Sequence, residues 1–195
     1  HEAVQEILIE SGKVAGVVTS KRQLSAEKVI ITAGAWTQQI LSSLEVEVTV
    51  EPVRGQMLVF AAEPGLLKHI VMQDGYYLIP RRDGHILIGS TLEYVGFDKS
   101  TTAEAKAELY EQAVSLLPAL SEFAVEKHWS GLRPGTQNGV PYICEHPHWR
   151  NLFINSGHFR NGVVLGLASV HLLGDLVAGR PSFVDSRAYA FEQEH

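Results

Sequence analysis

Alternating apolar and polar residues predict a small sheet at the start of the chain. Residues 4–10 and 13–20 each alternate over the length of a strand, and Ser11 and Gly12 between them suit a hairpin turn. A third short strand is expected at residues 23–26. Residues 28–33 are largely apolar, which is typical of a strand buried on both faces. This strand ends at Ala33 and Gly34, small residues that let a backbone or a ligand approach closely.

The middle of the chain predicts a larger antiparallel sheet. Residues 46–53 alternate with acidic residues, and residues 56–61 are expected to follow as their partner strand. Arg54 and Gly55 between them suit a bulge or a tight bend, and we interpret Arg54 as a structural or domain-crossing residue rather than a catalytic one. Residues 71–80 and 86–91 predict strands around a turn at 82–85. Tyr76 and Tyr77 are neighbours and must point to opposite faces, so one of them should face the core.

The clearest helical pattern covers residues 101–117. Thr101 and Glu104 are spaced as a capping box, and Pro118 ends the helix. Its apolar face would consist of Leu109, Ala113, Leu116 and Leu117.

The last third of the chain alternates strands with turns and closes on a helix. Strands are expected at residues 125–131 and 152–155. A helix over residues 163–178 would end at Gly179, with Pro181 just beyond. The pattern as a whole predicts an α+β fold built on an antiparallel-rich mixed sheet.

Composition excludes several classes of protein. The net charge is −6 and the pI is about 5.8, and no basic patch accompanies the aromatic residues, so we expect no nucleic-acid partner. The single cysteine, Cys144, excludes an intramolecular disulfide framework. The longest apolar run, residues 163–173, contains His171 and is too short to span a bilayer. With no signal peptide recognised, we expect a cytoplasmic protein without a membrane partner.

The histidines predict no metal site. Cys144, His146 and His148 carry thiol and imidazole groups, but their alternate spacing, broken by Pro147, matches no usual zinc motif. We interpret this cluster as a surface loop. His171 lies in an apolar helix and is most simply a satisfied core or edge histidine.

Two arginines in glycine-rich settings are the strongest chemical signal. Arg133 lies in GLRPGT (131–136), where Pro134 favours an extended backbone for the residue before it. Its guanidinium would project from a strand end or a turn, and its planar fork of donors suits a carboxylate. Arg160 lies in GHFRNG (157–162), between an apolar strand and a helix start, where free backbone N–H groups can face an anion or an electron-rich ring edge.

These motifs together resemble the C-terminal half of the FAD-dependent D-amino acid oxidase superfamily, most of all the glycine oxidases of thiamine biosynthesis. The likeness covers residues 29–181, and its motifs occur in the family's order. They are VIITAGAW (29–36), PVRGQ (52–56), YLIPR (77–81) with IGST (88–91), WSGLRPGT (129–136) and GHFRNG (157–162).

The resemblance implies a division into domains. Residues 1–45 would belong to a Rossmann-like FAD-binding domain, residues 46–150 to a substrate-binding domain, and residues 151–195 to a strand and helix that return to the FAD domain. The strands at 28–33 and 152–155 are expected to pair in parallel. The family's Gly-x-Gly-x-x-Gly fingerprint is absent from these residues, so we expect a fragment whose FAD site is incomplete and which is inactive alone.

The resemblance also assigns the substrate site. Arg133 and the hydroxyl of Tyr77 would hold the substrate carboxylate. Leu92 stands where glycine oxidase has a methionine that lines the pocket, and Gly75 replaces a bulkier residue near its entrance, so both alter the pocket volume. Taken alone, Arg133 could instead be a buried structural ion pair, and Tyr77 a half-buried aromatic of the sheet.

The cofactor residues implied by the resemblance lie in two turns. Ala33, Gly34 and Trp36 would lie near the nucleotide end of FAD, although a plain strand-to-helix turn covered by Trp36 fits equally. The second turn comprises Gly157, His158, Phe159, Arg160, Asn161, Gly162 and Val163. Arg160 and the N–H groups of residues 161–163 would stabilise negative charge on the flavin. Arg160 could alternatively pair with a carboxylate of the missing half, and His158 could touch flavin through its backbone or brace the turn.

The implied reaction is oxidation of glycine, or of sarcosine or a small D-amino acid, to an imino acid, with oxygen as electron acceptor and hydrogen peroxide as by-product. The imino acid would supply thiamine thiazole synthesis. Two alternatives stay open. The first is a dehydrogenase that uses an acceptor other than oxygen, and the second is a non-catalytic assembly module, with a homo-oligomer as one form of assembly.

Overall fold

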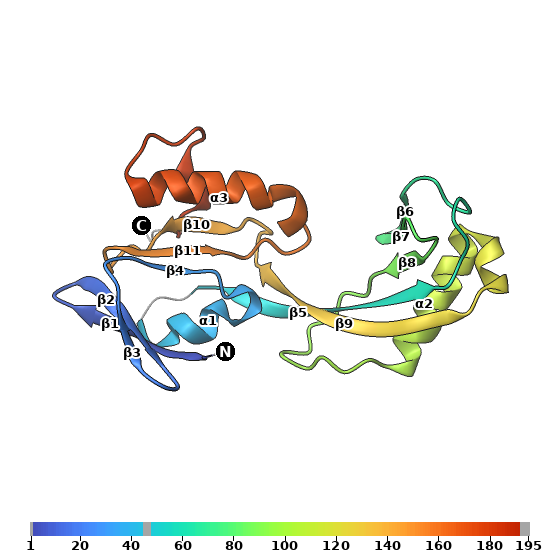
Figure 1. Cartoon of the computed structure of the whole chain (residues 1–195), viewed down its shortest axis with the longest axis horizontal. Coiled ribbons are helices and arrows are strands. Elements are labelled where there is room, and N and C mark those ends of the chain that lie inside the picture. Colours follow the sequence, from blue (N-terminus) through green and yellow to red (C-terminus); the bar gives the residue numbers. More distant parts are fainter. Residues whose placement is uncertain (1, 45–47, 192–195) are drawn as a thin grey trace. The chain divides into compact units, whose positions relative to one another are not determined.

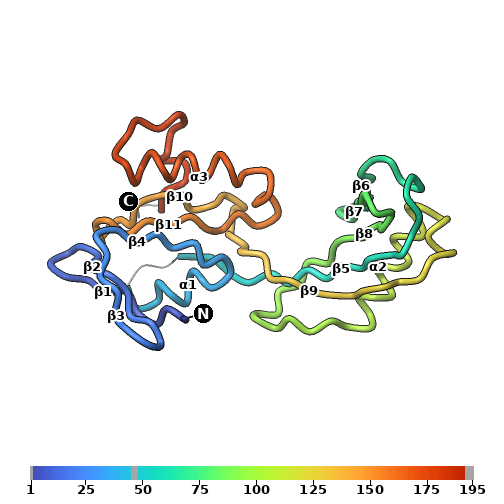
Figure 2. Tube along the Cα trace, viewed as in Figure 1, coloured from blue at the N-terminus to red at the C-terminus, as the bar shows by residue number. Residues whose placement is uncertain are grey.

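The structure, a computed structural model, describes residues 2–44 and 48–191 and divides into two compact units. The first comprises His1–Pro52 and Arg133–His195, and the second comprises Val53–Leu132. The chain enters the second unit along β5 (Val50–Phe60) and leaves it along β9 (Val125–Thr136) (Figures 1 and 2). The predicted middle domain, 46–150, is therefore wider than the compact second unit, and its first two residues lie outside the described ranges.

Two three-stranded sheets build the first unit. One has the order β1 (Val4–Glu10), β2 (Lys13–Thr19), β3 (Gln23–Ser25), which confirms the predicted hairpin and third strand. The other has the order β10 (Tyr142–Glu145), β11 (Leu152–Ser156), β4 (Val29–Ile31). β4 and β11 pair in parallel, with Leu152 opposite Val29, as the family resemblance implies.

β4 is shorter than predicted and is not buried on both faces. Ile31 packs into a core with Ile7, Leu41 and Ile154, whereas Ile30 points the other way and is 44% exposed. The apolar run therefore predicted the strand correctly. The prediction that both faces are buried was wrong, because only one face of β4 packs against the first unit's core.

Helices cover the β10–β11–β4 sheet (Figure 1). α3 (Gly162–Ala178) packs Leu172 and Leu173 against Ile143 and Phe153 of the sheet. It ends at Gly179, whose left-handed φ of 65° allows the cap, as the sequence predicts. The short α1 (Thr37–Leu41) lies toward the opposite face. Short 3₁₀ turns occur at Gly34–Trp36, Ser42–Leu44, Pro118–Glu122 and Ser186–Tyr189.

The second unit is one five-stranded sheet with a helix on one face. The strand order is β6 (Val71–Gln73), β7 (Tyr76–Pro80), β8 (Ile86–Gly89), β5, β9. α2 (Ala103–Leu116) packs Leu109 and Ala113 onto Leu58, Leu78 and Ile88. Tyr76 packs against this core and bonds through its hydroxyl to Glu108, whereas Tyr77 does not, which confirms their opposite orientations.

Three details of the second unit differ from the sequence-based expectation. β5 runs unbroken through Arg54 and Gly55, so residues 46–53 and 56–61 are not partner strands, and β5 pairs instead with β8. The N-cap of α2 is Thr102, not Thr101, because the Thr102 hydroxyl accepts the N–H of Ala105 at 3.2 Å. β9 continues through Arg133, since an extended residue before proline fits a strand as well as a turn.

Within the described residues, no helix combines the length and hydrophobicity needed to cross a membrane.

Candidate functional site

The two turns predicted to bind the cofactor meet at one edge of the first unit. β4 and β11 are parallel neighbours, so their carboxyl ends lie side by side. The Thr37 and Ser156 hydroxyl oxygens are 2.7 Å apart, and they lie 2.8 and 3.1 Å from the carbonyl oxygen of Gly34. Both side chains are almost fully buried. The turn after β4 is thus locked to the end of β11, the edge at which open α/β sheets bind ligands.

The second turn lies against the end of β9, next to Arg133. The N–H of Phe159 donates to the carbonyl of Pro134 at 3.0 Å. A Cβ on Gly157, whose φ is 82°, would be only 2.4 Å from Cγ2 of Thr136. The structure therefore brings the predicted carboxylate-binding strand and the predicted cofactor turn together in one unit.

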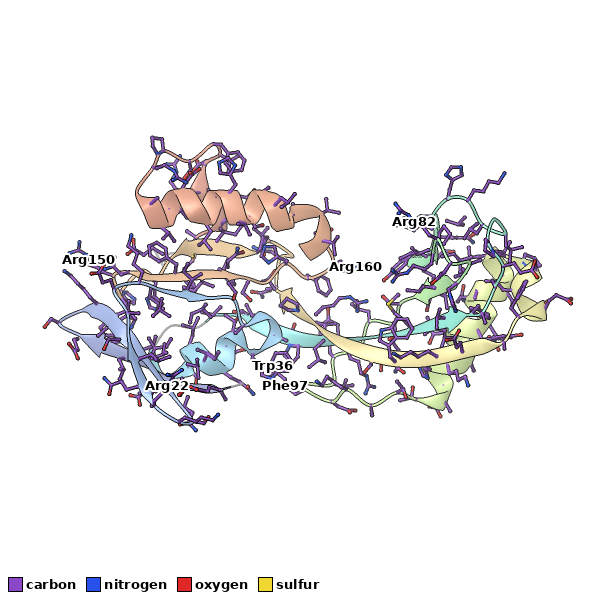
Figure 3. The ribbon with its side chains drawn as sticks, in the orientation of Figure 1. Arg22, Trp36, Arg82, Phe97, Arg150 and Arg160 are labelled. Carbon is purple, nitrogen blue, oxygen red and sulfur yellow. The ribbon has the colours of Figure 1, made fainter. Side chains whose placement is uncertain are left out.

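The start of α3 carries free hydrogen-bonding capacity. Its N-cap, Asn161, makes no side-chain cap, and the first turn holds no acidic residue. The side chains of Arg160 and Val163 are exposed, and Figure 3 shows Arg160 at the turn before the helix. Backbone N–H groups at a helix start attract negative charge.

His158 braces this turn from inside. Its Nε2 lies 2.9 Å from the Ser169 hydroxyl, which donates its own proton to the carbonyl of Leu165 at 2.9 Å. A hydroxyl has one proton, so Nε2 must be the donor and His158 carries its proton there. Burial lowers the pKa of His158, which favours this neutral form. The side-chain contact with Ser169 supports the bracing role, and a contact between the His158 backbone and flavin stays a prediction.

The remaining predicted site residues lie in the second unit. Tyr77 stacks its ring over Gly89, where an added Cβ would meet ring atoms at 2.8 Å, and its hydroxyl lies 3.3 Å from Oγ of Ser90. Leu92 follows on the next segment and is 47% exposed. Tyr77 and Leu92 therefore belong to one unit, and Arg133 with the cofactor turns belongs to the other.

The Cys144 to His148 segment is only in part the surface loop that its composition suggested, because Pro147 and His148 are exposed and lie outside any strand, whereas Cys144 and His146 are not on the surface. Cys144 belongs to β10, and both Cys144 and His146 are at least 95% buried. His146 Nδ1 accepts the N–H groups of His148 and Trp149, each at 3.2 Å. Burial lowers the pKa of His146 to about 4 and raises that of Cys144 to about 12.

Across residues 2–44 and 48–191, no three His, Cys, Asp or Glu side chains gather as a metal site would require. His171 is an edge histidine, largely exposed, stacked on Phe183 and 3.6 Å from Asp175.

Sequence reasoning missed the polar cluster around Arg54 as an organised feature. Arg54 is 4% exposed and pairs with Glu93 and Asp98. Burial alone would raise the pKa of Glu93, but hydrogen bonds from Thr91, Arg54 and Gln56 hold it below its ordinary value. The sequence signal for this cluster was a pair of acids, Glu93 and Asp98, which lie five residues apart after the strand predicted at 86–91.

One shallow pocket of about 240 Å³ lies in the second unit, between Arg81, His85, Lys127 and Trp129. Among the described residues, none of those predicted to bind substrate or cofactor lines it.

Comparison with known proteins decides the family. The model of the "FAD dependent oxidoreductase" family matches residues 1–176. The chain belongs to this family. It is 46% identical over 183 residues to a glycine oxidase of Pseudomonas aeruginosa, covering 94% of this chain and 50% of that protein. A glycine oxidase of Pseudomonas putida is also 46% identical over 192 residues, covering 98% and 53%. The crystal structure of glycine oxidase from Geobacillus kaustophilus superposes with a TM-score of 0.93 at 30% identity, covering 100% of this chain and 52% of that one.

The chain spans about half the length of the curated relatives it matches. Membership of this family implies FAD as the cofactor, and the residues described above are compatible with part of its site. Uncapped N–H groups at the start of α3 suit an electron-rich ring edge. Oγ1 of Thr136, beside Gly157, is buried and makes no hydrogen bond within the described chain, so the turn has unmet polar capacity.

Proposed function

We propose that this chain forms the substrate-binding and flavin-ring part of an amino acid oxidase that acts on glycine or another small amino acid. The product would be an imino acid, with hydrogen peroxide formed from oxygen. One observation carries the proposal. The Phe159 N–H bond to Pro134 joins the strand that bears Arg133 to the glycine turn before α3. This bond supports the proposal because it holds the candidate carboxylate-binding arginine and the candidate flavin-edge donors within a single unit.

Arg133 would bind the substrate carboxylate through two parallel hydrogen bonds, which fixes the position of the α-carbon. Tyr77 would add its hydroxyl to that carboxylate, a part of the proposal that rests on the family resemblance alone. FAD, when bound, would supply the chemistry by accepting a hydride from the α-carbon. Arg160 and the N–H groups at the start of α3 would stabilise negative charge at the flavin edge. Such a reaction depends on positioning more than on acid and base groups.

The test uses a protein expressed at the full length of its relatives and Arg133→Ala, with Arg187→Ala as the control. Arg187 is also an arginine of the first unit, but it is exposed and pairs only with Asp185 within the described chain. We expect glycine to bleach bound flavin without oxygen in the wild type and the control. Loss of a charge-assisted clamp costs about 2–4 kcal/mol, so Arg133→Ala should need roughly 100-fold more glycine or fail to respond.

Each result has a distinct meaning. Unchanged bleaching in Arg133→Ala would remove Arg133 from the clamp. A flavin left oxidised by glycine, sarcosine and small D-amino acids would overturn the substrate assignment. Peroxide release on admitting oxygen supports an oxidase, whereas reduction without peroxide indicates a dehydrogenase.

The finer part of the proposal is that the imino acid supplies thiamine thiazole synthesis, which the family resemblance supports. Deleting the gene should then create a requirement for thiazole, and growth without it would contradict this role.

A further inference from the structure

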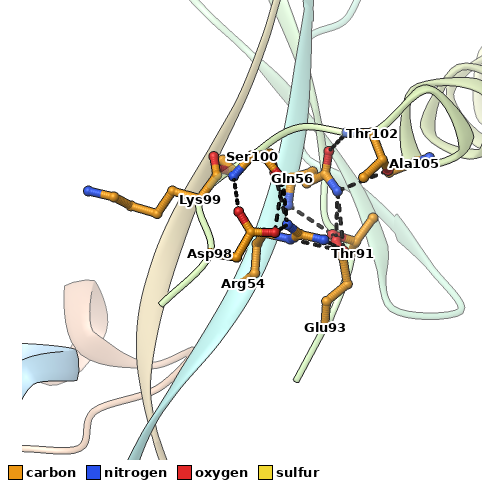
Figure 4. Close-up of polar contacts among 10 residues, drawn as sticks. Arg54, Gln56, Thr91, Glu93, Asp98, Lys99, Ser100, Thr102 and Ala105 are labelled. Atoms are coloured by element: carbon orange, nitrogen blue, oxygen red, sulfur yellow. Dashed lines mark hydrogen bonds and ion pairs between the residues drawn. The ribbon is translucent and has the colours of Figure 1, made fainter. Parts of the chain in front are cut away.

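The buried guanidinium of Arg54 holds both ends of one short segment. Nε and Nη2 donate to Oε2 of Glu93 at 3.0 and 2.5 Å, and Nη1 donates to Oδ2 of Asp98 at 2.6 Å (Figure 4). Only residues 94–97 separate these two acids. Hydrogen bonds between Arg54 and both carboxylates raise the pKa of the guanidinium further. The Arg54 guanidinium therefore joins the two ends of the 94–97 segment.

Neighbouring side chains fix the same two ends. Gln56 is fully buried, and its Nε2 donates to Oε1 of Glu93 at 2.9 Å while its Oε1 accepts the N–H of Thr102 at 3.0 Å. Oδ1 of Asp98 accepts the N–H of Ser100 at 2.8 Å. The segment is thereby tied to β5 on one side and to the N-cap of α2 on the other.

This pairing determines where Leu92 points. Glu93 and Arg54 exchange backbone hydrogen bonds of 2.8 and 3.0 Å, as in an antiparallel pair, and Thr91 Oγ1 accepts the N–H of Gln56 at 2.9 Å. Side chains alternate along extended backbone, so Thr91 and Glu93 face the cluster and Leu92 faces away. Thr91 is 7% exposed, whereas Leu92 is 47% exposed.

The clamped segment displays apolar side chains to solvent. Tyr94, Val95 and Phe97 are 64%, 42% and 38% exposed. Tyr94 is more than half exposed and gains little from packing at this position, so the polar cluster beneath the segment contributes to its conformation. A segment held at both ends by hydrogen bonds to a buried guanidinium presents its apolar side chains in a more fixed arrangement, which lowers the entropy cost of ordering them on binding.

We propose that Arg54, together with Glu93 and Asp98, is a positioning residue that fixes Leu92 and the 94–97 segment and so sets the size of amino acid that the enzyme accepts. This inference rests on the proposed function and on the family resemblance, which implies that Leu92 lines the substrate pocket. Arginine is required because its donors lie in one plane and reach both acids at once, whereas the single ammonium of lysine cannot reproduce that geometry.

The first arm of the test measures positioning without any activity. Amide hydrogen exchange of residues 93–100 would be compared in the wild type, Arg54→Lys and Asp98→Asn. Asp98→Asn keeps the shape of a side chain that is 51% exposed, so it keeps the test valid if Arg54→Lys does not fold. The control, Asp185→Asn, weakens an exposed Arg–Asp pair of the first unit. Exchange should rise about tenfold over 93–100 in both variants and stay unchanged in β7 and β8. Unchanged exchange in the variants that fold would overturn the positioning role.

The second arm measures specificity in the full-length enzyme. In Asp98→Asn, KM for glycine should rise about 3- to 10-fold with kcat nearly unchanged, and the ratio of kcat/KM for glycine to that for D-alanine should fall. Asp185→Asn should change neither value. Faster exchange with an unaltered ratio would show that the segment is held but does not set substrate size. If no amino acid reduces the wild-type flavin, the specificity role fails with the proposed function, while the exchange arm still decides the positioning role.

Discussion

Gly157 is a single residue on which the geometry of the candidate site depends. Its φ of 82° is one that side chains rarely adopt, and its missing Cβ leaves room for the Thr136 methyl group. This close approach lets the turn lie against β9, where Phe159 reaches Pro134. The need for glycine here is therefore both conformational and steric.

Replacing Gly157 with Ala should destabilise the chain more than the same change at Gly12. Gly12 also has a positive φ, 76°, but nothing lies within 4 Å of an added Cβ. Gly12→Ala should cost about 1 kcal/mol for the backbone alone, and Gly157→Ala about 1–3 kcal/mol more for the clash. Urea unfolding of both variants measures the difference. Equal losses of stability in the two variants would show that the contact with Thr136 relaxes without cost. If Gly157→Ala loses more than Gly12→Ala, adding Thr136→Ser should restore part of the difference, because it removes the methyl group.

His146 should make stability depend on pH in the acid range. Its pKa is about 4 when folded, against an ordinary 6.5, because burial disfavours the charged form. The unfolded chain therefore binds more protons between these values, and stability falls as the pH drops through that window. From pH 7 to pH 5 the loss from this one residue is about 2 kcal/mol.

His146→Asn tests this directly. Asn can accept the N–H groups that His146 Nδ1 accepts from His148 and Trp149, but it does not titrate. The free energy of unfolding should then fall less steeply between pH 7 and pH 5 than in the wild type. His171→Asn is the control, because its side chain is 64% exposed. Parallel pH profiles for wild type and His146→Asn would contradict the prediction.

At the level of elements, the sequence predicted the secondary structure of each segment better than it predicted which strands pair. Period-two alternation identified β1 and β2, and a terminal glycine identified the end of α3. Alternation could not show that β5 passes through Arg54 without a break, since the ion pairs that make a buried arginine tolerable come from acids 39 and 44 residues away. The parallel pairing of β4 with β11 was expected only from the family resemblance.

Thr101 and Thr102 provide a matched test of the start of α2. The Thr102 hydroxyl caps the helix and also accepts a hydrogen bond from Gln56 Nε2 at 3.3 Å, whereas Thr101 held the capping role only in the sequence-based expectation. Thr102→Ala should cost about 1–2 kcal/mol, and Thr101→Ala less than about 0.5 kcal/mol. Thermal unfolding of the two variants decides between them, and a larger loss in Thr101→Ala would place the cap one residue earlier.

At the scale of the whole molecule, the sequence predicted candidate site residues but not the contacts that hold them. The two arginine motifs pointed to Arg133 and to the turn at residues 157–162, which lies beside it. The hydroxyl pair that locks the two turns, Thr37 and Ser156, is 119 residues apart in sequence and carries no local pattern. Long-range contacts of this kind follow from packing, which periodicity along the chain cannot reveal.

The surface of α3 leads to a prediction about the behaviour of the chain in solution. Val163, Val164, Leu167 and Val170 lie on one side of the helix and are 99%, 85%, 89% and 63% exposed. Contiguous apolar surface of this kind drives association in water. The 195-residue chain should therefore self-associate and bind an apolar dye.

Leu167→Lys with Val170→Lys should reduce both effects without lowering the midpoint of thermal unfolding, because neither side chain belongs to the described cores. The control is Ile70→Lys, which changes an apolar side chain of the second unit that is also 63% exposed. Light scattering and dye fluorescence at increasing protein concentration measure the outcome. An equal reduction in Ile70→Lys would show that total exposed apolar area, and not the stripe on α3, controls association.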